Sequence, residues 1–337
     1  MKIYNFAIIG CGAIADIHAK AISEIPNAKI CGVFDIHRES ASRFACKYGT
    51  KIFSTIEELC GCQDVDIVNV CTPSGLHAEI LIKLANANKN IVVEKPMAIT
   101  KKQLDDVIFA VEKNKVKVAV ITQLRFTPAV QKLKSAIQEG RLGQILMADY
   151  NMKYYRSPEY YSAGGWRGTW EMDGGGALMN QGIHGIDLIQ YLLGGIKSVY
   201  ATCRTMARAI ETEDVAYLMV EYNNGALGYI HCTTLAEPGY PRRIEITGTK
   251  GTVVLEEDVI KTWDVQGENV ESGTTACNSA SNPMMISYGY HKMQFEDLIR
   301  AIETDMKPLV DVYEGRKPVD IILAAYSSSK TGKKVQI

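Results

Sequence analysis

Strand-like and helix-like segments alternate along the first third of the chain, and this alternation restricts the possible folds more than any other feature. Strands are expected near residues 3–9, 29–35, 66–71, 90–93 and 117–121, and helices near 13–24, 38–47, 75–88 and 101–114. Thr55 and Thr100 each stand three residues before a Glu or Gln, which is the spacing of a capping box at a helix start. Consecutive βαβ units form a parallel sheet that helices cover on both faces. The sequence therefore predicts an α/β fold with a doubly wound parallel sheet.

The first strand is followed by the glycine-rich turn Gly10-Cys11-Gly12-Ala13-Ile14-Ala15. Between a strand and a helix, this pattern allows a tight turn, lets backbone amides approach a pyrophosphate and permits close helix–strand packing. Asp35 ends the second strand, where a carboxylate binds ribose hydroxyls and repels a 2′-phosphate. Arg38 could stack on adenine or partly offset that repulsion. These residues predict a dinucleotide site that favours NAD over NADP.

Two further loops follow strand ends, which is the edge of a doubly wound sheet where ligands bind. One contains Thr72, Pro73 and His77, and the other is Glu94-Lys95-Pro96. We expect His77 in the first turn of a helix, with a structural role or a contact to the cofactor. Lys95 stands between an apolar strand and a proline, so we expect it to be held rigidly at the ligand-binding edge.

The pattern changes after residue 122. We expect a helix near 127–139, a strand near 144–153 and a helix from the glycine run 174–176 to Leu193. Strands follow near 197–206, 214–222, 226–234, 241–247, 251–255 and 259–264, then an irregular loop at 267–287 and helices near 290–304 and 315–330. Several strands in succession indicate a separate α+β domain with a large mixed or antiparallel sheet. We therefore predict a dinucleotide-binding domain at 1–122 and a second domain at 123–337, whose last helix, 315–330, could pack back near the first.

A polar stripe crosses the apolar helix of the second half. Asn180, His184 and Asp187 are four and then three residues apart and share one helix face. Such a stripe must face water, a polar partner or a ligand. One interpretation is a core histidine bonded to Asp187, and the other is a catalytic histidine. The dinucleotide turn and Lys95 in the same chain favour the second, because histidine suits the removal of a hydroxyl proton while a hydride leaves for nicotinamide.

An aromatic and basic loop precedes that helix and contains Arg156, Trp166 and Arg167. Arginine suits carboxylate or phosphate binding, and flat aromatic faces suit the C–H surface of a sugar ring. The alternative is that these aromatic side chains pack at the domain interface. The loop indicates a sugar-type substrate with an anionic group without identifying it.

The composition excludes several classes of protein. The chain has 37 basic and 38 acidic residues, without the basic excess of nucleic-acid-binding proteins. No apolar run approaches the roughly 18 residues of a membrane-spanning helix. The nine cysteines are scattered, and the close pair Cys60 and Cys62 has no partners at zinc spacing. We therefore expect no nucleic acid, no membrane and no metal, and a reducing, cytoplasmic location.

The glycine turn, Asp35, Thr72-Pro73 with His77, Glu94-Lys95-Pro96 and the helix from Gly174 to Leu188 together resemble the glucose–fructose oxidoreductase/inositol dehydrogenase/rhizopine-catabolism (Gfo/Idh/MocA) family. The resemblance spans nearly the whole chain. It implies a Rossmann domain followed by an α+β domain whose open sheet often forms homodimers or homotetramers. It also implies Lys95 and His184 as the catalytic pair. Members commonly carry Asp where this chain has Asn180, for which we expect a hydrogen bond to substrate.

The resemblance implies an NAD-dependent dehydrogenase that takes a hydride from a secondary alcohol of a sugar, a nucleotide sugar such as a UDP-sugar acid, or a cyclitol. The string from Trp166 to His184 is similar to members that oxidise C3 of UDP-N-acetylglucosaminuronate. Two alternatives stay open: a glycosidase whose NAD is reduced and reoxidised in each turnover, and a non-catalytic NAD-binding sugar sensor. The expected cofactor-binding residues are Gly10, Cys11, Gly12, Ala13, Ile14, Asp35, Arg38, Thr72, Pro73, His77, Glu94 and Lys95. The expected substrate-binding residues are Lys95, Arg156, Trp166, Arg167, Asn180 and His184.

Overall fold

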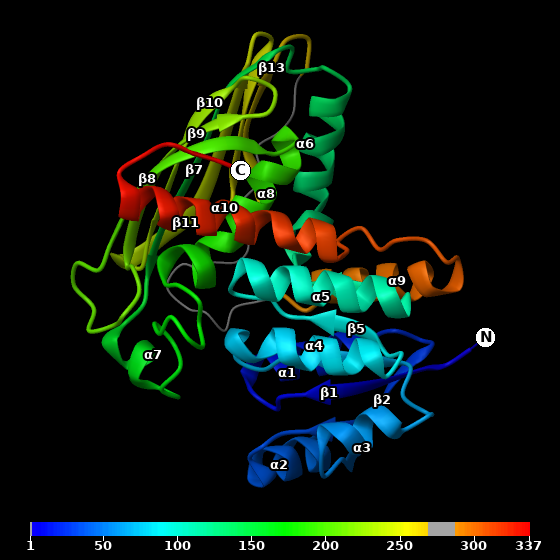
Figure 1. Cartoon of the computed structure of the whole chain (residues 1–337). Helices are drawn as coiled ribbons and strands as arrows, with labels where there is room; N and C mark the ends of the chain where they lie inside the picture. Colours follow the sequence, from blue (N-terminus) through cyan, green and yellow to red (C-terminus); the bar gives the residue numbers. More distant parts are fainter. Residues whose placement is uncertain (1, 269–286) are drawn as a thin grey trace. The chain divides into compact units, whose positions relative to one another are not determined.

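The computed structural model describes residues 2–268 and 287–337, which form two compact units (Figure 1). Of these residues, the first unit holds 2–123 and 287–316, and the second holds 124–268 and 317–337. The division expected between residues 122 and 123 lies one residue from the observed one. Segment 287–316, which we expected in the second domain, belongs instead to the first unit. The loop expected at 267–287 lies almost entirely outside the described residues.

The first unit is built on a parallel sheet with strand order β3-β2-β1-β4-β5-β6. Its strands are β1 (Tyr4–Ile9), β2 (Ala28–Phe34), β3 (Lys51–Ile52), β4 (Ile67–Val70), β5 (Asn90–Val93) and β6 (Val118–Val120). This is the order of the Rossmann fold, so the predicted doubly wound sheet is confirmed. The order reverses between β1 and β4, and ligands of such sheets bind at the carboxyl ends of the strands there.

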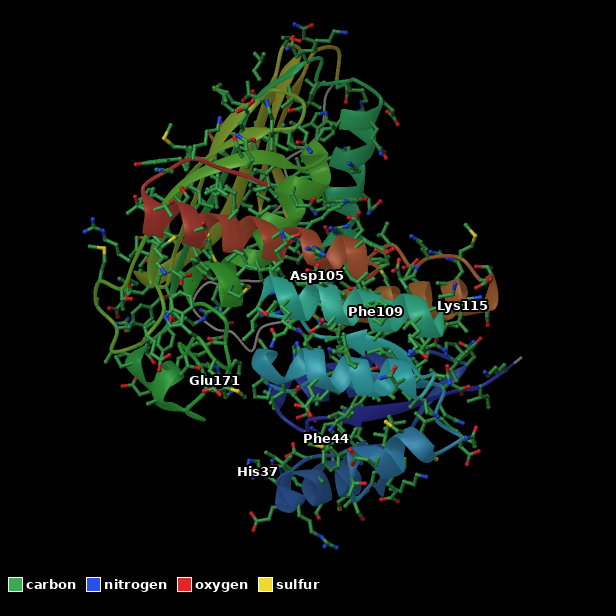
Figure 2. All side chains as sticks on the ribbon, in the orientation of Figure 1. His37, Phe44, Asp105, Phe109, Lys115 and Glu171 are labelled. Atoms are coloured by element: carbon green, nitrogen blue, oxygen red, sulfur yellow. The ribbon has the colours of Figure 1, made fainter. Side chains whose placement is uncertain are left out.

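Helices pack against this sheet, and all but the last of them come from the part of the chain in which the sequence predicts this domain. They are α1 (Ala13–Ser23), α2 (Arg38–Tyr48), α3 (Ile56–Gly61), α4 (His77–Asn86) after the 3₁₀ turn η1 (Ser74–Leu76), α5 (Lys101–Asn114) and α9 (Gly289–Glu303). The capping box at Thr100 is present on α5, because the Thr100 and Gln103 side chains each accept the other's backbone N–H. Asp105 and Phe109, labelled in Figure 2, lie on the exposed face of α5.

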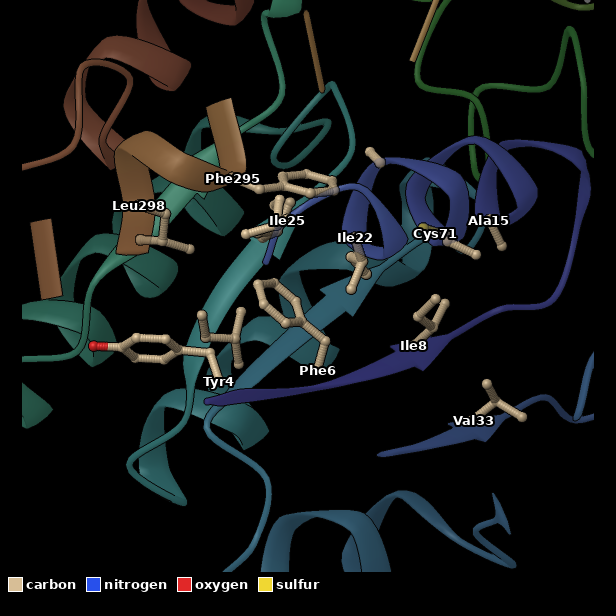
Figure 3. Packing of buried hydrophobic residues seen from close by; sticks show 14 of the residues in the cluster. Tyr4, Phe6, Ile8, Ala15, Ile22, Ile25, Val33, Cys71, Phe295 and Leu298 are labelled. Atoms are coloured by element: carbon tan, nitrogen blue, oxygen red, sulfur yellow. The ribbon is translucent and has the colours of Figure 1, made fainter. Parts of the chain in front are cut away.

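Helix α9 joins the first unit because its apolar face completes the core. Phe295 and Leu298 are fully buried together with Phe6 and Ile22, as Figure 3 shows. The rings of Phe6 and Phe295 lie 6.2 Å apart. Polar contacts also fasten the segment to the edge of the sheet, since the Gln294 side chain donates to the Val120 carbonyl oxygen at 2.7 Å.

The second unit contains a mixed sheet with strand order β13-β12-β11-β7-β10-β9-β8-β14. Its strands are β7 (Ile145–Tyr155), β8 (Ile196–Arg204), β9 (Val215–Tyr222), β10 (Leu227–Thr233), β11 (Leu235–Gly248), β12 (Gly251–Glu256), β13 (Val259–Val265) and β14 (Val335–Gln336). Strand β10 runs parallel to β7, and the other neighbours pair antiparallel. The expected α+β unit with a large mixed sheet is thereby confirmed.

The remaining helices are η2 (Gln123–Phe126), α6 (Pro128–Gln138), α7 (Pro158–Ser162), the π-helical turn η3 (Ala177–Gly182), α8 (Ile183–Leu193) and α10 (Val312–Thr331). Helix α8 packs on β7, and Gly185 is required there because a Cβ would lie 2.1 Å from the Tyr150 ring. None of the described helices is long and apolar enough to cross a membrane.

The opposite face of the second unit's sheet carries large apolar side chains. On β9, Ala216, Leu218 and Val220 are buried, whereas Tyr217 and Met219 between them are 55% and 69% exposed. Tyr200 and Tyr229 lie beside Met219 on the neighbouring strands and are also exposed. We call Tyr200, Tyr217, Met219 and Tyr229 the outer-face patch.

Candidate active site

The glycine turn between β1 and α1 leaves the start of the helix open. Gly10 has a φ of +90°, and a Cβ there would lie 2.7 Å from the Cys71 carbonyl oxygen, so only glycine fits. Gly12 is the N-cap of α1, with no side-chain cap and no heavy atom within 4 Å of a Cβ position. Ala13 and Ile14 begin the helix, and Ala15 is fully buried. Such an uncapped helix start offers free amides and the positive end of the dipole to an anion.

Asp35 is tied to this turn. Its Oδ2 accepts the Cys11 N–H at 2.7 Å and its Oδ1 accepts the His37 N–H at 2.8 Å. The carboxylate therefore also fixes the turn, a role that the sequence analysis missed. A carboxylate has about four acceptor positions, so two remain for ribose hydroxyls. Arg38 is the first residue of α2 and is exposed.

His77 joins the two other predicted loops. It is buried, with Nδ1 2.7 Å from the Pro96 carbonyl oxygen and Nε2 2.9 Å from the Thr72 carbonyl oxygen. Burial lowers the pKa of His77, which favours a neutral ring that donates to one of these oxygens. Pro73, which precedes η1, is half-buried. The Thr72 hydroxyl is buried and has no hydrogen-bond partner among the described residues. With the open helix start and Asp35, this hydroxyl makes the site fit a dinucleotide.

Lys95 is the one residue between 91 and 99 that is not buried. Glu94 beside it is buried, its Oε1 accepting from His18 Nε2 at 2.9 Å and its Oε2 from the Lys95 backbone N–H at 3.2 Å. Burial opposes ionisation of the Glu94 carboxyl, but the hydrogen bond from His18 and nearby positive groups outweigh it and lower its pKa to about 2. The residue that precedes Lys95 is therefore a buried, ionised carboxylate.

His291 completes this cluster from α9. Its Nε2 lies 3.9 Å from Glu94 Oε1, and burial lowers its pKa to about 4. In the described part of the chain, His18, Glu94 and His291 are the one set of possible metal ligands whose atoms lie within 4.8 Å of one another. His18 and His291 were not among the predicted site residues, because positions 18 and 291 are distant along the chain.

In the second unit, the polar stripe lies on the π-helical turn and α8. Asn180, Gln181 and His184 are the only residues from 177 to 190 that are not buried. Asp187 is buried instead, and its carboxylate accepts from Arg125 Nε at 2.8 Å and Nη2 at 2.6 Å. The Asp187 end of the stripe is thus a buried ion pair, and its open end carries Asn180 and His184.

Asn180 belongs to a hydrogen-bonded network. Its Nδ2 donates to Asp173 Oδ1 at 2.6 Å, and its Oδ1 accepts from Gln181 Nε2 at 2.9 Å. Gln181 also accepts from Arg156 Nη2 at 2.9 Å and donates to the Tyr160 hydroxyl at 3.0 Å. Both ends of the Asn180 amide are therefore held. Neither Asp173 nor Gln181 was among the predicted site residues.

The two predicted arginines differ in accessibility. Arg156 is buried and stacks on the Tyr154 and Tyr160 rings, so it supports the network from within. Arg167 is half-buried, with its guanidinium carbon 4.5 Å from the Tyr160 ring centroid and 5.0 Å from that of Trp166. Trp166 is half-buried as well. Arg167 is thus the more accessible of the two for an anionic ligand.

Glu213 caps the start of the helical segment that carries Asn180 and His184. Its Oε2 accepts from the Gly176 N–H at 3.0 Å, and its Oε1 accepts from the Leu178 N–H at 2.8 Å and the Tyr326 hydroxyl at 3.0 Å. Burial raises the pKa of Glu213 to about 7. Nothing in the sequence marked this residue, because a cap from a distant segment, here the residues just before β9, leaves no local pattern.

Comparison with known proteins bears on both units. Residues 4–122 match the model of an oxidoreductase family with an NAD-binding Rossmann fold, and residues 130–254 match the GFO/IDH/MocA C-terminal domain. The structure of the WlbA dehydrogenase from Bordetella pertussis, in complex with NADH and UDP-GlcNAcA, is 31% identical, with a TM-score of 0.92 over 100% of this chain and 98% of that one. A levoglucosan dehydrogenase in complex with NADH and levoglucosan is 25% identical, with a TM-score of 0.90 over 100% of both chains. Inositol 2-dehydrogenase of Rhizobium meliloti is 29% identical over 257 residues, 75% of each chain.

Proposed function

Because this chain belongs to the Gfo/Idh/MocA family of NAD-binding oxidoreductases, we propose that it oxidises a secondary alcohol of a sugar, a nucleotide sugar or a cyclitol. One observation carries the proposal. In the first unit, residues 91–99 are all buried except Lys95. In the second unit, residues 177–190 are all buried except Asn180, Gln181 and His184. These polar side chains suit the proposed chemistry. Lys95, Asn180 and His184 are the positions that the family resemblance marks.

The first unit offers the cofactor site. The uncapped start of α1 at Gly12 would hold the pyrophosphate, and Asp35 the adenosine ribose. Arg38, Thr72 and His77 are further proposed contacts. NAD, when bound, supplies the carbon that accepts the hydride.

Two residues would act on the substrate. His184 would take the hydroxyl proton, since imidazole is a base of suitable strength near neutral pH. Lys95 would hydrogen-bond a substrate oxygen and stabilise the negative charge that develops there. Asn180 would orient the substrate, and its amide is fixed for this by Asp173 and Gln181.

A UDP-sugar acid is the substrate that we favour. A relative that this chain matches over its full length is described in complex with NADH and UDP-GlcNAcA. Arg167, stacked on Trp166 and Tyr160, offers an accessible guanidinium of the kind that binds carboxylates. Trp166 would contribute an aromatic face to the sugar.

The decisive experiment measures NADH formation from UDP-N-acetylglucosaminuronate and, as a matched control, from UDP-N-acetylglucosamine, which lacks the carboxylate. Free hexoses, glucose 6-phosphate, levoglucosan and myo-inositol complete the panel. We expect net NADH release with the acid and much less with its control, and Arg167→Gln should reduce this preference. Cleavage of a glycosidic bond without net NADH would support the glycosidase alternative instead. NAD binding with no turnover of any of these compounds would support the sensor.

We further propose that the chain forms a homo-oligomer through the sheet of the second unit. The outer-face patch exposes tyrosine and methionine side chains on adjacent strands, and contiguous apolar surface on a folded protein commonly marks an interface.

A further inference from the structure

Three titratable side chains from distant segments meet in the interior of the first unit. His18 of α1 is 0% exposed, His291 of α9 is 1% exposed, and Glu94 after β5 is 7% exposed. Burying a carboxylate is costly unless hydrogen bonds and charges compensate it. Such a cluster therefore needs a reason beyond packing.

The hydrogen bonds indicate the tautomer of His18. Asn69 Nδ2 lies 3.1 Å from His18 Nδ1, so with this amide orientation Nδ1 accepts, and the proton resides on Nε2, which donates to Glu94 Oε1 at 2.9 Å. His291 Nδ1 faces the Ser287 carbonyl oxygen at 3.4 Å. The protonated nitrogen of His18 thus points at Glu94, and the chain itself supplies the partner of that carboxylate oxygen.

The second oxygen of Glu94 links this cluster to Lys95. Oε2 accepts the Lys95 backbone N–H at 3.2 Å, and His77 Nδ1 lies 2.7 Å from the carbonyl oxygen of Pro96. The turn Glu94–Pro96 is therefore held from both sides by buried imidazoles. Its one side chain that is not buried is Lys95.

We propose that His18 and Glu94 are positioning residues for Lys95: the His18 imidazole fixes the Glu94 carboxylate, which accepts the Lys95 backbone N–H and brings a negative charge to this turn, while His291 packs against the pair. The catalytic consequence rests on the proposed function, but the placement of charge does not. The titratable groups that interact with Glu94 include His18, His291, Lys95, Cys71 and His77. The Cys71 thiol adds no negative charge to this cluster, since burial raises its pKa well above its ordinary value.

The proposal predicts the titration of Lys95. A carboxylate close to an ammonium group favours the charged form, so removing the carboxylate charge lowers the lysine pKa. In Glu94→Gln, which keeps the shape of the side chain, the Lys95 midpoint should fall by about one pH unit. His18→Leu leaves the carboxylate without its donor and should have a similar effect, whereas His18→Gln retains a donor and should restore much of the wild-type value.

The test uses the full chain and no substrate. Competitive acetylation with acetic anhydride is followed by mass spectrometry of the Lys95 peptide from about pH 6 to about pH 11, a range that spans the ordinary lysine pKa. Ile299→Ala is the matched control, because it removes buried atoms from the same helix as His291 without touching Glu94. This variant should lose stability and keep the wild-type Lys95 midpoint.

The outcomes are distinct. An unchanged Lys95 midpoint in Glu94→Gln overturns the positioning role and leaves the proposed function standing. Conversely, near-wild-type turnover by Lys95→Ala overturns the proposed role of Lys95 in the reaction, whatever the labelling shows. One equivalent of tightly bound zinc in the purified chain would also overturn the proposal, since a cation and not His18 would then hold Glu94 Oε1.

Discussion

At the scale of single residues, Asp35 has one observed role and one proposed role. Its carboxylate holds the glycine turn through the Cys11 N–H and has acceptor positions left for a ribose. Asp35→Ser should weaken NAD⁺ binding and reduce the preference for NAD⁺ over NADP⁺ roughly tenfold, because one charge repulsion disappears. Affinities measured by calorimetry test this, with Glu39→Ser, an exposed acid in the first turn of α2, as the control. A wild type that binds both cofactors equally would contradict the assignment of Asp35.

Lys95 and His184 carry the sharpest expectation at this scale. Lys95→Ala or His184→Ala should lower kcat by roughly 10²–10⁴-fold, the usual effect of losing an acid/base group, with little change in NAD⁺ affinity. Asn180→Ala should act mainly on KM. If Lys95 and His184 serve one step, the double variant should be little worse than the worse single variant. Lys113→Ala, an exposed lysine on α5, should match the wild type. Full turnover by His184→Ala would make its imidazole structural.

The candidate site residues that the sequence predicts are those that stand in local patterns. Gly10, Asp35 and Lys95 follow strand ends, and Asn180 and His184 share a helix face. Partners that only the fold brings together leave no such trace. Arg125 pairs with Asp187, and His18 with Glu94, across large distances in the chain.

At the scale of elements, most helices and strands with clear periodicity were predicted within a few residues, although β11 begins at Leu235 and not near 241. Strand β3 was missed, because its two residues are exposed and too few to show a pattern. The π-helical turn at 177–182 was expected as ordinary helix. It follows three glycines, and Gly176 is required there because a Cβ would lie 1.9 Å from the Glu213 carbonyl oxygen. Such geometry depends on a neighbouring strand and not on local sequence.

We expect the Glu213 cap to make the stability of the second unit sensitive to pH. Burial raises its pKa to about 7, from an ordinary value of 4.5. Folding therefore favours the protonated carboxyl, and this contribution to stability is complete below about pH 4.5 and lost as the pH rises through about 7. The difference amounts to about 3 kcal/mol at most.

Urea unfolding at both ends of this pH range should show that loss of stability in the wild type and much less in Glu213→Gln. The three tryptophans, Trp166, Trp170 and Trp263, all lie in the second unit and report on it. Parallel pH curves for the two proteins would contradict the role of Glu213.

At the scale of the whole molecule, the two kinds of sheet were foreseen from the order of strands and helices. The assignment of residues 287–316 was not, because a helix reveals its apolar face but not which sheet that face covers. The sequence shows that Phe295 lies on the apolar face of α9, but that face could have packed on the sheet of either unit.

Assembly is the prediction that belongs to this scale. Met219→Glu places a charge in the centre of the outer-face patch and should shift the protein towards monomer, as measured by light scattering at micromolar concentration. Phe109→Glu makes the same kind of change at an exposed residue of α5 and should leave the mass unchanged. A wild-type monomer at that concentration would rule out the interface.

The return of α9 to the first unit has a consequence for biosynthesis. The ribosome releases the Rossmann strands first, but the side chains that cover Phe6 and Ile22 are encoded only after the whole stretch 124–286 of the second unit. Domains usually fold in order of emergence. Here the second unit is inserted within the first. The newly made Rossmann sheet therefore keeps one apolar surface exposed until α9 has been synthesised. A chain that stops anywhere between residues 124 and 286 would keep that surface exposed, and we expect such fragments to be bound by chaperones or degraded.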